Sequence, residues 1–284
     1  MKPVRARVRS VCKSPALRAR LRAVFCGKPL MSETVTAAVV VIGNEILSGR
    51  TRDANIAFLA ENLTGLGIRL KEVRVVGDVE DEIVAAVNEL RHRHTYVFTT
   101  GGIGPTHDDI TADSIAAAFG VGISIHPEVR DSLVAYARER GIESNEARLR
   151  MARIPDGARL IDNEVSMAPG FQIGNVFVLA GVPEIARAMF RAASSGLRGG
   201  PRIMSRAIRV HCGEGTIAGA LGALQQDFPD VDMGSYPWRD GGTFGTSIVL
   251  RSTDRERLDT AFDRVFHASA QAGGNPVEED VANS

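Results

Sequence analysis

Residues 97–111, VFTTGGIGPTHDDIT, combine residue types that together suit phosphate chemistry. An apolar, β-rich stretch leads into three glycines within residues 101–104, and two acids, Asp108 and Asp109, follow. Glycines let backbone N–H groups approach an anion closely, and a helix that starts at Thr111 favours negative charge at its N-terminus. The two carboxylates could hold a divalent cation or activate water. The segment therefore predicts a site for a phosphate-bearing ligand.

Two further acids follow predicted strands. Glu45 comes shortly after the apolar run Thr36–Ile42, and Asp78 follows the apolar stretch Val73–Val76. Because the carboxyl ends of parallel strands meet at one edge of a sheet, we expect these loops to converge on the glycine-rich loop. Taken singly, each acid has a plainer interpretation: Glu45 as a solvated or capping acid, and Asp78 and Asp109 as caps of the helices that follow them.

The pattern of apolar residues predicts the elements that position these loops. Short apolar strands alternate with amphipathic helices through short connections, which is typical of parallel βαβ units with right-handed crossovers. Gly174-Asn175 between two apolar runs predicts a hairpin that adds antiparallel strands to the mostly parallel sheet. A Gly/Pro-rich linker then leads to a small α+β subdomain. The predicted ranges are 1–33 for a basic leader, 34–198 for the α/β domain, 199–271 for the α+β subdomain and 272–284 for a disordered tail.

Composition restricts the possible partners. The 284 residues are 44% hydrophobic and 24% charged, and no apolar run is long enough to cross a bilayer, so no membrane partner is expected. The formal net charge is zero, but residues 1–30 carry nine Lys or Arg and no acid, which leaves 25 basic against 34 acidic residues in 31–284, a charge of −9. An acidic body argues against a nucleic-acid partner. Three widely spaced cysteines predict no disulfide framework, and we expect a cytoplasmic location.

The basic leader is open to three interpretations. It is a flexible arm, an organelle-targeting segment, or the product of a start site placed upstream of Met31.

Several segments resemble one known family. GGIGPTHDDIT resembles the glycine-rich motif of the molybdopterin-binding domain that MoaB/Mog-like molybdopterin adenylyltransferases share with CinA-type (competence/damage-inducible A) proteins. The resemblance covers about residues 36–270 and favours the CinA-type branch. The segments that carry it are VIGNEILSGRTRDANIAFLAENLTGLGI (41–68), VVGDVEDEI (75–83), MAPGF (167–171), GVPEIARAMF (181–190) and SYP (235–237).

Two departures from the family pattern affect the expectation. Residues 179–183 read Leu-Ala-Gly-Val-Pro where the family usually has Leu-Pro-Gly-Val-Pro, and loss of the proline at Ala180 should loosen this loop. The C-terminal deamidase domain of full-length CinA proteins is not found in this sequence. Amide hydrolysis is therefore not implied.

The resemblance implies a three-layer αβα domain that binds a pterin phosphate or a nucleotide, with molybdopterin as one candidate ligand. In the adenylyltransferases, acids that match Asp78 and Asp109 are implicated in the transfer reaction. The CinA-type branch, and the related domain of eukaryotic FAD synthases, are associated with metal-dependent cleavage of a nucleotide pyrophosphate such as ADP-ribose or FAD. We expect hydrolysis of this kind, with adenylyl transfer to molybdopterin and a non-catalytic pterin- or nucleotide-binding module as alternatives. A homo-oligomer is implied by the resemblance alone.

The predicted site combines the residues chosen by their chemistry with those that the family resemblance implies. The catalytic candidates are Asp109, Asp78 and Glu45, and Mg²⁺ or another divalent cation is assigned to Asp109, Asp108 and Asp78. The three arginines that follow helical spacing predict a solvated face, with contact to a substrate phosphate as the lesser alternative. The predicted phosphate-binding residues are Gly101, Gly102, Gly104, Thr100 and Gly43, and the three arginines are Arg148, Arg150 and Arg153.

Overall fold

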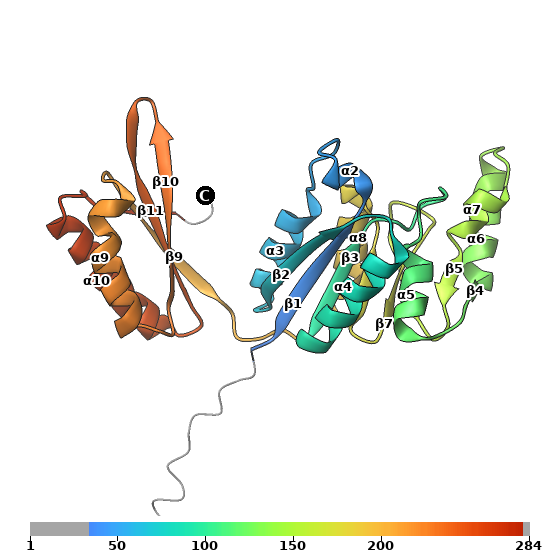
Figure 1. Cartoon of the computed structure of the whole chain (residues 1–284), viewed down its shortest axis with the longest axis horizontal. Coiled ribbons are helices and arrows are strands. Elements are labelled where there is room, and N and C mark those ends of the chain that lie inside the picture. The colour runs from blue at the N-terminus through green and yellow to red at the C-terminus, as the bar shows by residue number, and fades with distance from the viewer. Residues whose placement is uncertain (1–33, 281–284) are drawn as a thin grey trace, which may run out of the picture. The chain divides into compact units, whose positions relative to one another are not determined.

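Figure 1 shows the computed structural model of the chain, in which residues 34–280 are described. The predicted basic leader, 1–33, lies outside the described residues, as do residues 281–284. Within the described part, no helix is long and apolar enough to cross a membrane.

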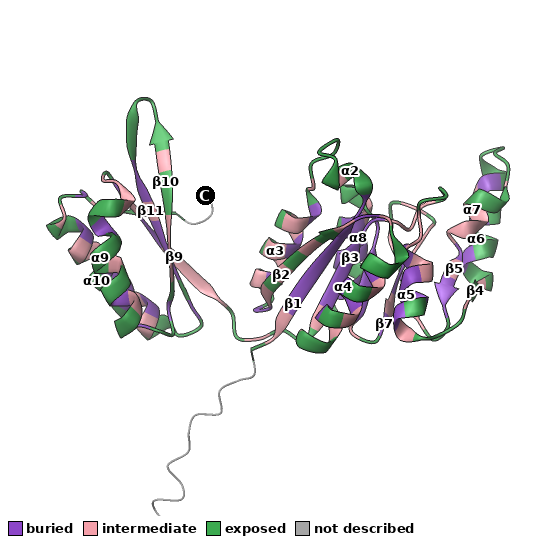
Figure 2. Cartoon of the chain, viewed as in Figure 1, coloured by how far each residue is buried: buried purple, intermediate pink, exposed green. Residues whose placement is uncertain are grey.

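A six-stranded sheet in the order β2-β1-β3-β8-β7-β6 forms the centre of the α/β domain. The first four strands of this order are parallel, and the β7–β8 hairpin turns at Gly174-Asn175 as predicted, so β7 runs antiparallel to β8. Figure 2 shows the central strands buried along their length. The strands are β1 (Thr36–Ile42), β2 (Arg69–Val76), β3 (Tyr96–Thr100), β6 (Arg159–Ile161), β7 (Gly170–Ile173) and β8 (Val176–Leu179).

Helices cover both faces of this sheet because successive side chains of β1 point to opposite sides. Val39 and Val41 pack with α3 and α8, whereas Val40 and Ile42 pack with α4 and α5. The predicted three-layer αβα architecture with a mostly parallel sheet is therefore confirmed. The helices are α3 (Asn55–Gly65), α4 (Glu80–Arg93), α5 (Thr111–Phe119) and α8 (Pro183–Ser194).

A small structural unit follows α5 in the chain. Pro127 and Gly141 predict the bounds of its longer helix, but the sequence pattern did not identify its strands or its shorter helix. Its two short strands pair antiparallel, and a minor core cluster forms around Val129, Leu133 and Ala152. The helix α2 (Asn44–Leu47), a single turn after β1, was also missed. The elements of the unit are β4 (Ile123–Ile125), α6 (Pro127–Glu139), α7 (Glu146–Arg150) and β5 (Arg153–Pro155).

The C-terminal subdomain has the predicted α+β composition and its own apolar core. Its four-stranded antiparallel sheet has the order β10-β11-β9-β12, and two helices pack against it. The elements are β9 (Met204–Val210), α9 (Glu214–Asp227), β10 (Asp232–Asp240), β11 (Thr243–Ser252), α10 (Arg255–Gln271) and β12 (Val277–Glu279).

The strand β12 contradicts the prediction of a disordered tail over 272–284 within the described part of that range, 272–280. Residues 277–279 pair with β9, and the Glu279 carboxylate accepts a hydrogen bond of 2.6 Å from the Ser247 hydroxyl and lies 3.4 Å from Arg209. The polar composition of this segment gave no strand signal because pairing at a sheet edge requires few apolar side chains.

Candidate functional site

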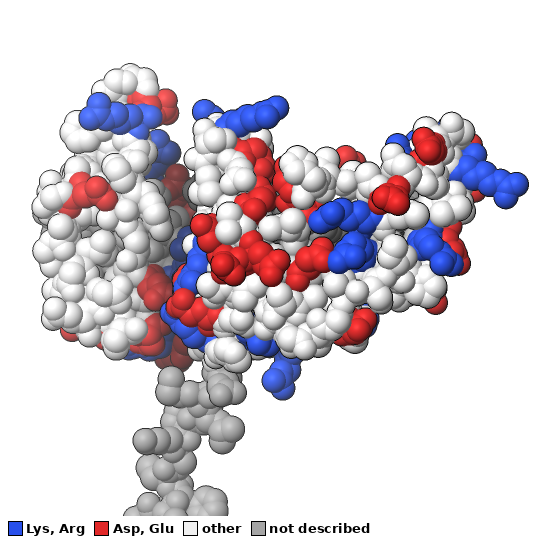
Figure 3. All heavy atoms as spheres, turned by 45° about the vertical axis from the view of Figure 1, so that its right-hand side comes forward, with Lys and Arg blue, Asp and Glu red and all other residues white. Residues whose placement is uncertain are grey.

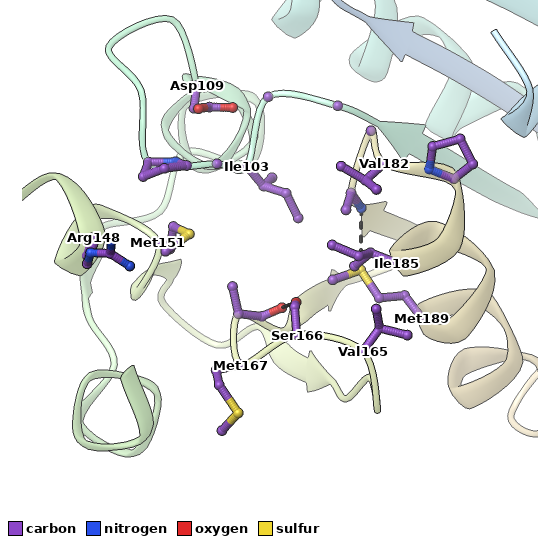
Figure 4. A pocket seen from close by; sticks show the side chains of 18 of the residues that line it. Ile103, Asp109, Arg148, Met151, Val165, Ser166, Met167, Val182, Ile185 and Met189 are labelled. Atoms are coloured by element: carbon purple, nitrogen blue, oxygen red, sulfur yellow. Dashed lines mark hydrogen bonds between the residues drawn. The ribbon is translucent and has the colours of Figure 1, made fainter. Parts of the chain in front are cut away.

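A cavity of about 640 Å³ lies beyond the carboxyl end of β3, where ligands bind in open α/β sheets. Figure 4 shows side chains from separate segments of the chain around its open centre. The lining comes from the glycine-rich loop after β3, the loop after β8, the unit formed by α6 and α7, residues 165–168, and α2 with the loop that follows it. Of the three loops predicted to converge at this sheet edge, those that carry Glu45 and Asp109 line the cavity, and Asp78 of the third loop does not.

The first two glycines of the loop are required by close packing. A Cβ atom at Gly101, where φ is +104°, would lie 2.1 Å from the Ile42 carbonyl oxygen. A Cβ at Gly102, where φ is +67°, would lie 2.1 Å from the Thr111 hydroxyl. Thr111 fixes this turn by donating its hydroxyl to the Gly101 carbonyl and its N–H to the Gly102 carbonyl, each at 2.9 Å. No other residue type fits these two positions.

Asp109 does not cap the helix that follows, as one interpretation proposed. Its carboxylate accepts a hydrogen bond of 2.8 Å from the Thr106 N–H and a second from the Thr106 hydroxyl, and α5 begins without a side-chain cap. A Cβ at Gly104 would lie 2.7 Å from the Asp109 carboxylate, so this acid sits directly against the third glycine. Both residues line the cavity.

Asp108 points elsewhere. It is exposed and is absent from the cavity lining. The nearby polar side chain of Thr106, together with a backbone N–H, holds the pKa of Asp108 below its ordinary value. Asp108 is therefore a charged surface acid at neutral pH.

Asp78 connects two loops instead of capping α4. Its carboxylate accepts a 2.9 Å hydrogen bond from the Asn44 N–H at the start of α2, and Val79 precedes α4 without a side-chain cap. The interpretation of Asp78 as a helix cap is therefore wrong. Asp78 is absent from the cavity lining, whereas Glu45, the next residue after Asn44, belongs to it.

The predicted residues thus divide into two groups. Glu45, Asp109 and the glycines of the loop line one cavity, and Gly43 lies beneath Glu45, since a Cβ there would lie 2.5 Å from its carboxylate. Outside the lining are Asp78, Asp108, and the buried residues Thr100 and Gly43.

The acids do not form a metal site by themselves. Among residues 34–280, no group of three or more His, Cys, Asp or Glu side chains is close enough to hold a cation. Glu45 and Asp109 supply two carboxylates, which is the number that Mg²⁺ commonly takes from a protein when phosphate oxygens and water complete its shell. Glu45 and Asp109 are therefore the carboxylates of the lining that a cation arriving with a phosphate ligand would meet.

The solvated face predicted for the three arginines is wrong. Arg153 lies on β5 and pairs with Asp113, and the Arg150 guanidinium lies 4.0 Å from the same carboxylate and 3.4 Å from the Asp109 carbonyl. Arg148 lines the cavity, and within the described chain its guanidinium has no ion-pair partner. Asn145 accepts a 3.0 Å hydrogen bond from the Arg148 N–H and so fixes the start of α7. An unpaired guanidinium suits a phosphate.

Two contacts hold the loop that lacks the family proline. The Asn55 side chain donates a 2.9 Å hydrogen bond to the Gly181 carbonyl, and the Ala180 N–H, which a proline would lack, lies 3.3 Å from the Met189 sulfur. A Cβ at Gly181 would lie 3.2 Å from the Gly101 Cα, so this loop packs directly on the glycine-rich loop.

Sequence reasoning missed most of the cavity's apolar lining, because an apolar residue in a loop carries no chemical signature. The sequence signal that could have found part of it is the family-like segment 181–190, which contributes the cavity residues Val182, Pro183, Ile185 and Met189.

Acidic and basic side chains are unevenly distributed on the face shown in Figure 3. On the face in Figure 3, acidic side chains form the larger connected groups, and Lys and Arg lie in smaller separate ones. This face therefore offers no continuous basic surface for a phosphate backbone.

Comparison with known proteins decides the family. Residues 38–197 match the family described as "Probable molybdopterin binding domain". The chain belongs to this family. Residues 202–274 match a second family, "FAD synthase, middle domain".

Relatives agree with this membership in the molybdopterin-binding domain family. A protein of Aeropyrum pernix is 32% identical over 271 residues, which cover 88% of this chain and 99% of the relative. A "Probable FAD synthase" of Caenorhabditis elegans is 31% identical over 263 residues, which cover 84% of this chain but only 50% of the relative, so the chain spans about half of that protein. The crystal structure of CinA from Thermoplasma acidophilum, a protein of unknown function, is 36% identical, covers 57% of this chain and 96% of that one, and has a TM-score of 0.52.

Proposed function

We propose that the protein hydrolyses the anhydride bond of a nucleotide pyrophosphate, of the ADP-ribose or FAD type, in this cavity. The observation that carries the proposal is the joint presence of a tightly packed glycine loop, two carboxylates and an unpaired guanidinium around one space. Amides and a guanidinium stabilise the charge that builds on phosphate oxygens, and carboxylates act on water or on a cation. The FAD synthase names among its relatives support an enzyme that acts on nucleotides.

Each group has a proposed role. Backbone N–H groups of the glycine-rich loop bind one phosphate, and Arg148 binds the other or the adjacent sugar. Asp109, held by Thr106, and Glu45 accept a proton from the attacking water or hold a divalent cation that arrives with the pyrophosphate. Such a cation neutralises phosphate charge and lowers the pKa of bound water. Asp78 acts on the site through Asn44, by fixing the turn that carries Glu45.

The experiment is a product assay on the purified full chain. ADP-ribose, FAD, NAD and inorganic pyrophosphate are each incubated with and without Mg²⁺, and chromatography follows the release of AMP from the nucleotides and of phosphate from inorganic pyrophosphate. We expect AMP from at least one nucleotide pyrophosphate, only with a divalent cation. If none of the nucleotides is cleaved with any of Mg²⁺, Mn²⁺ or Co²⁺, the hydrolase proposal is wrong.

Adenylyl transfer to molybdopterin is the second candidate, favoured by the match to the molybdopterin-binding domain. ATP, Mg²⁺ and molybdopterin are mixed with the protein, and an adenylylated pterin is sought by mass spectrometry. Tight binding of the pterin or a nucleotide without any product would instead support a non-catalytic binding module.

A further inference from the structure

Arg148 and the glycine-rich loop reach the cavity from different parts of the chain. The loop follows β3, whereas Arg148 belongs to the small unit formed by β4, α6, α7 and β5, here named the α6–α7 unit. This unit has a minor apolar core of its own around Leu133. Figure 1 shows it beside α5, at the end of the α/β domain, and its two strands contact α5. Its attachment to α5 therefore determines where Arg148 lies relative to the glycine-rich loop.

One carboxylate of α5 holds this unit. Asp113 accepts hydrogen bonds from two nitrogens of the Arg153 guanidinium, and the Arg150 guanidinium lies 4.0 Å from the same carboxylate. Arg150 is the last residue of α7 and Arg153 the first of β5, so both ends of the connection between them are held. The three side chains are only 27–36% exposed, so water screens their attraction less than it screens that of a fully exposed pair.

The same turn of α5 also fixes the glycine-rich loop. Thr111, two positions before Asp113, donates its hydroxyl to the Gly101 carbonyl at 2.9 Å. The Arg150 Nε donates a 3.4 Å hydrogen bond to the Asp109 carbonyl, so α7 also contacts the segment that follows the loop. A narrow second cavity lies among these groups, and its lining includes Gly102, Asp109, Asp113, Arg150 and Arg153. The first turn of α5 therefore connects the loop to the unit that carries Arg148.

We propose that Asp113 is a positioning residue: through Arg153 and Arg150 it holds α7 where Arg148 reaches a phosphate bound beside the glycine-rich loop. The inference rests on the proposed function in assigning a phosphate contact to Arg148. Asp113 is absent from the lining of the larger cavity, so it acts on a ligand through the arginines. Without its charge the two guanidiniums lose their common partner, and the end of α7 gains freedom that ligand binding must then remove.

The test measures binding of α,β-methylene-ADP to the full chain by calorimetry in the presence of Mg²⁺. The two phosphates of this probe are joined through carbon, so the protein cannot hydrolyse the link between them. Asp113→Asn keeps the shape of the side chain and should weaken binding roughly three- to tenfold, the size of effect common for coupled neighbouring groups. Asp113→Glu restores the carboxylate and should bind the probe more tightly than Asp113→Asn does.

A double-mutant cycle shows whether Asp113 acts through Arg148. Arg148→Gln removes the phosphate contact directly and should weaken binding roughly tenfold. In that background, Asp113→Asn should cause little further loss, because no guanidinium remains to be positioned. A general loosening of the fold would instead add its own loss to that of Arg148→Gln.

Asp230→Asn is the matched control. Asp230 lies outside the cavity and accepts hydrogen bonds of 2.6 and 2.8 Å from Arg257. Its substitution removes one carboxylate charge from an arginine pair, as Asp113→Asn does. It should lower stability, measured by urea unfolding, and leave binding of the probe unchanged.

The outcomes separate this inference from the hydrolase proposal. Parent-like binding in Asp113→Asn, additive losses in the double variant, or an equal loss in Asp230→Asn would overturn the positioning role. Absence of probe binding by the parent protein would also overturn it, since Arg148 would have no phosphate to reach. Non-additive losses, together with no AMP release in the product assay, would support the positioning role and refute hydrolysis.

Discussion

The glycine-rich loop after β3 and the helix α9 of the subdomain both contain several glycines, for opposite reasons. A Cβ at Gly101 or Gly102 would lie 2.1 Å from a neighbouring oxygen. In α9, a Cβ at any glycine would have no atom of another residue within 4 Å, beyond the helix's own nearby backbone. Close packing therefore requires the glycines of the loop, whereas the surroundings of the helix would accept a larger residue at each of its glycines. The α9 glycines are Gly215, Gly219 and Gly222.

Charged residues show the same contrast. In the subdomain, Arg206 lies 3.1 Å from Asp259 and 2.9 Å from Glu278. Around the cavity, neither Glu45 nor Arg148 has an ion-pair partner within residues 34–280. The subdomain's charges are used in its own structure, while those of the cavity are available to a ligand. The following experiments test this difference.

Adding one methyl group should separate the two sets of glycines. Gly101→Ala forces a Cβ into the Ile42 carbonyl oxygen at a positive φ and should lower the free energy of unfolding by about 3 kcal/mol or more. Gly219→Ala should raise it by about 0.5–1 kcal/mol, because alanine favours a helix and the space is open. Urea unfolding of both variants measures the difference. Similar effects of the two substitutions would show that the loop is not tightly packed.

Removing one carboxylate charge should distinguish an acid of the cavity from an acid in a surface ion pair. Asp109→Asn keeps the shape of the side chain and should lower the rate of AMP release by on the order of 10² or more, the typical loss for an acid–base or metal-holding group. The control Asp131→Asn changes an exposed acid of α6 that pairs with Arg130, and it should keep the parent rate. Thermal unfolding confirms that both variants fold. Parent activity in Asp109→Asn would refute its assigned role.

The same comparison can be made with two cations, Arg148 at the cavity and Arg206 in the subdomain. Arg148→Gln should raise KM roughly tenfold with a smaller change in kcat, because a charge-assisted hydrogen bond to phosphate contributes about 1.5–3 kcal/mol. Arg206→Gln removes a guanidinium that stacks on Phe262 and pairs with two acids, so it should lower stability and leave KM unchanged. Steady-state kinetics with the nucleotide substrate measure KM and kcat for both variants. An unchanged KM in Arg148→Gln would exclude contact with the substrate.

The elements of the fold were predictable because their signals are local. The apolar run Thr36–Ile42 matches β1 residue for residue, and the helix predicted to start at Thr111 is α5. Apolar periodicity and helix-ending glycines act within one turn or one strand. The exposed β12 carries no such signal, since its pairing with β9 depends on where the chain returns.

The site was predictable in part. Spacing identified Glu45 and Asp109 with the glycines, since a strand followed by a glycine loop places them at one sheet edge. It could not tell which acid enters the cavity: Asp78 has a similar sequence context to Glu45, yet its partner is the Asn44 N–H, 34 positions away. Arg148 was assigned to a solvated face because helical spacing alone does not reveal what packs across from a helix.

The smallest effect that we expect is on stability at low pH, and it concerns paired charges outside the cavity. Arg74 of β2 lies 2.7 Å from Glu72 and 2.8 Å from Glu89 of α4, and this hydrogen bonding lowers the pKa of Glu89 from 4.5 to about 2. A carboxyl group with a depressed folded-state pKa stabilises the protein above its unfolded pKa and loses that contribution as pH falls through the folded value. Stability should therefore fall between about pH 5 and pH 2, in part through Glu89.

Glu89→Gln should flatten this part of the pH profile slightly, measured by urea unfolding at each pH. Glu61→Gln is the matched control, since Glu61 is exposed on α3 and has no ion pair in the described chain. The Glu89 effect should shrink in 1 M NaCl, because the interaction is at the surface and salt screens it. Asp109→Asn offers the opposite signature: a large loss of turnover at constant pH with little change in stability. If the stability of Glu89→Gln fell with pH as steeply as that of the parent protein, this ion-pair cluster would contribute nothing measurable to stability. The comparison between paired and unpaired charges would then depend on the cavity residues alone.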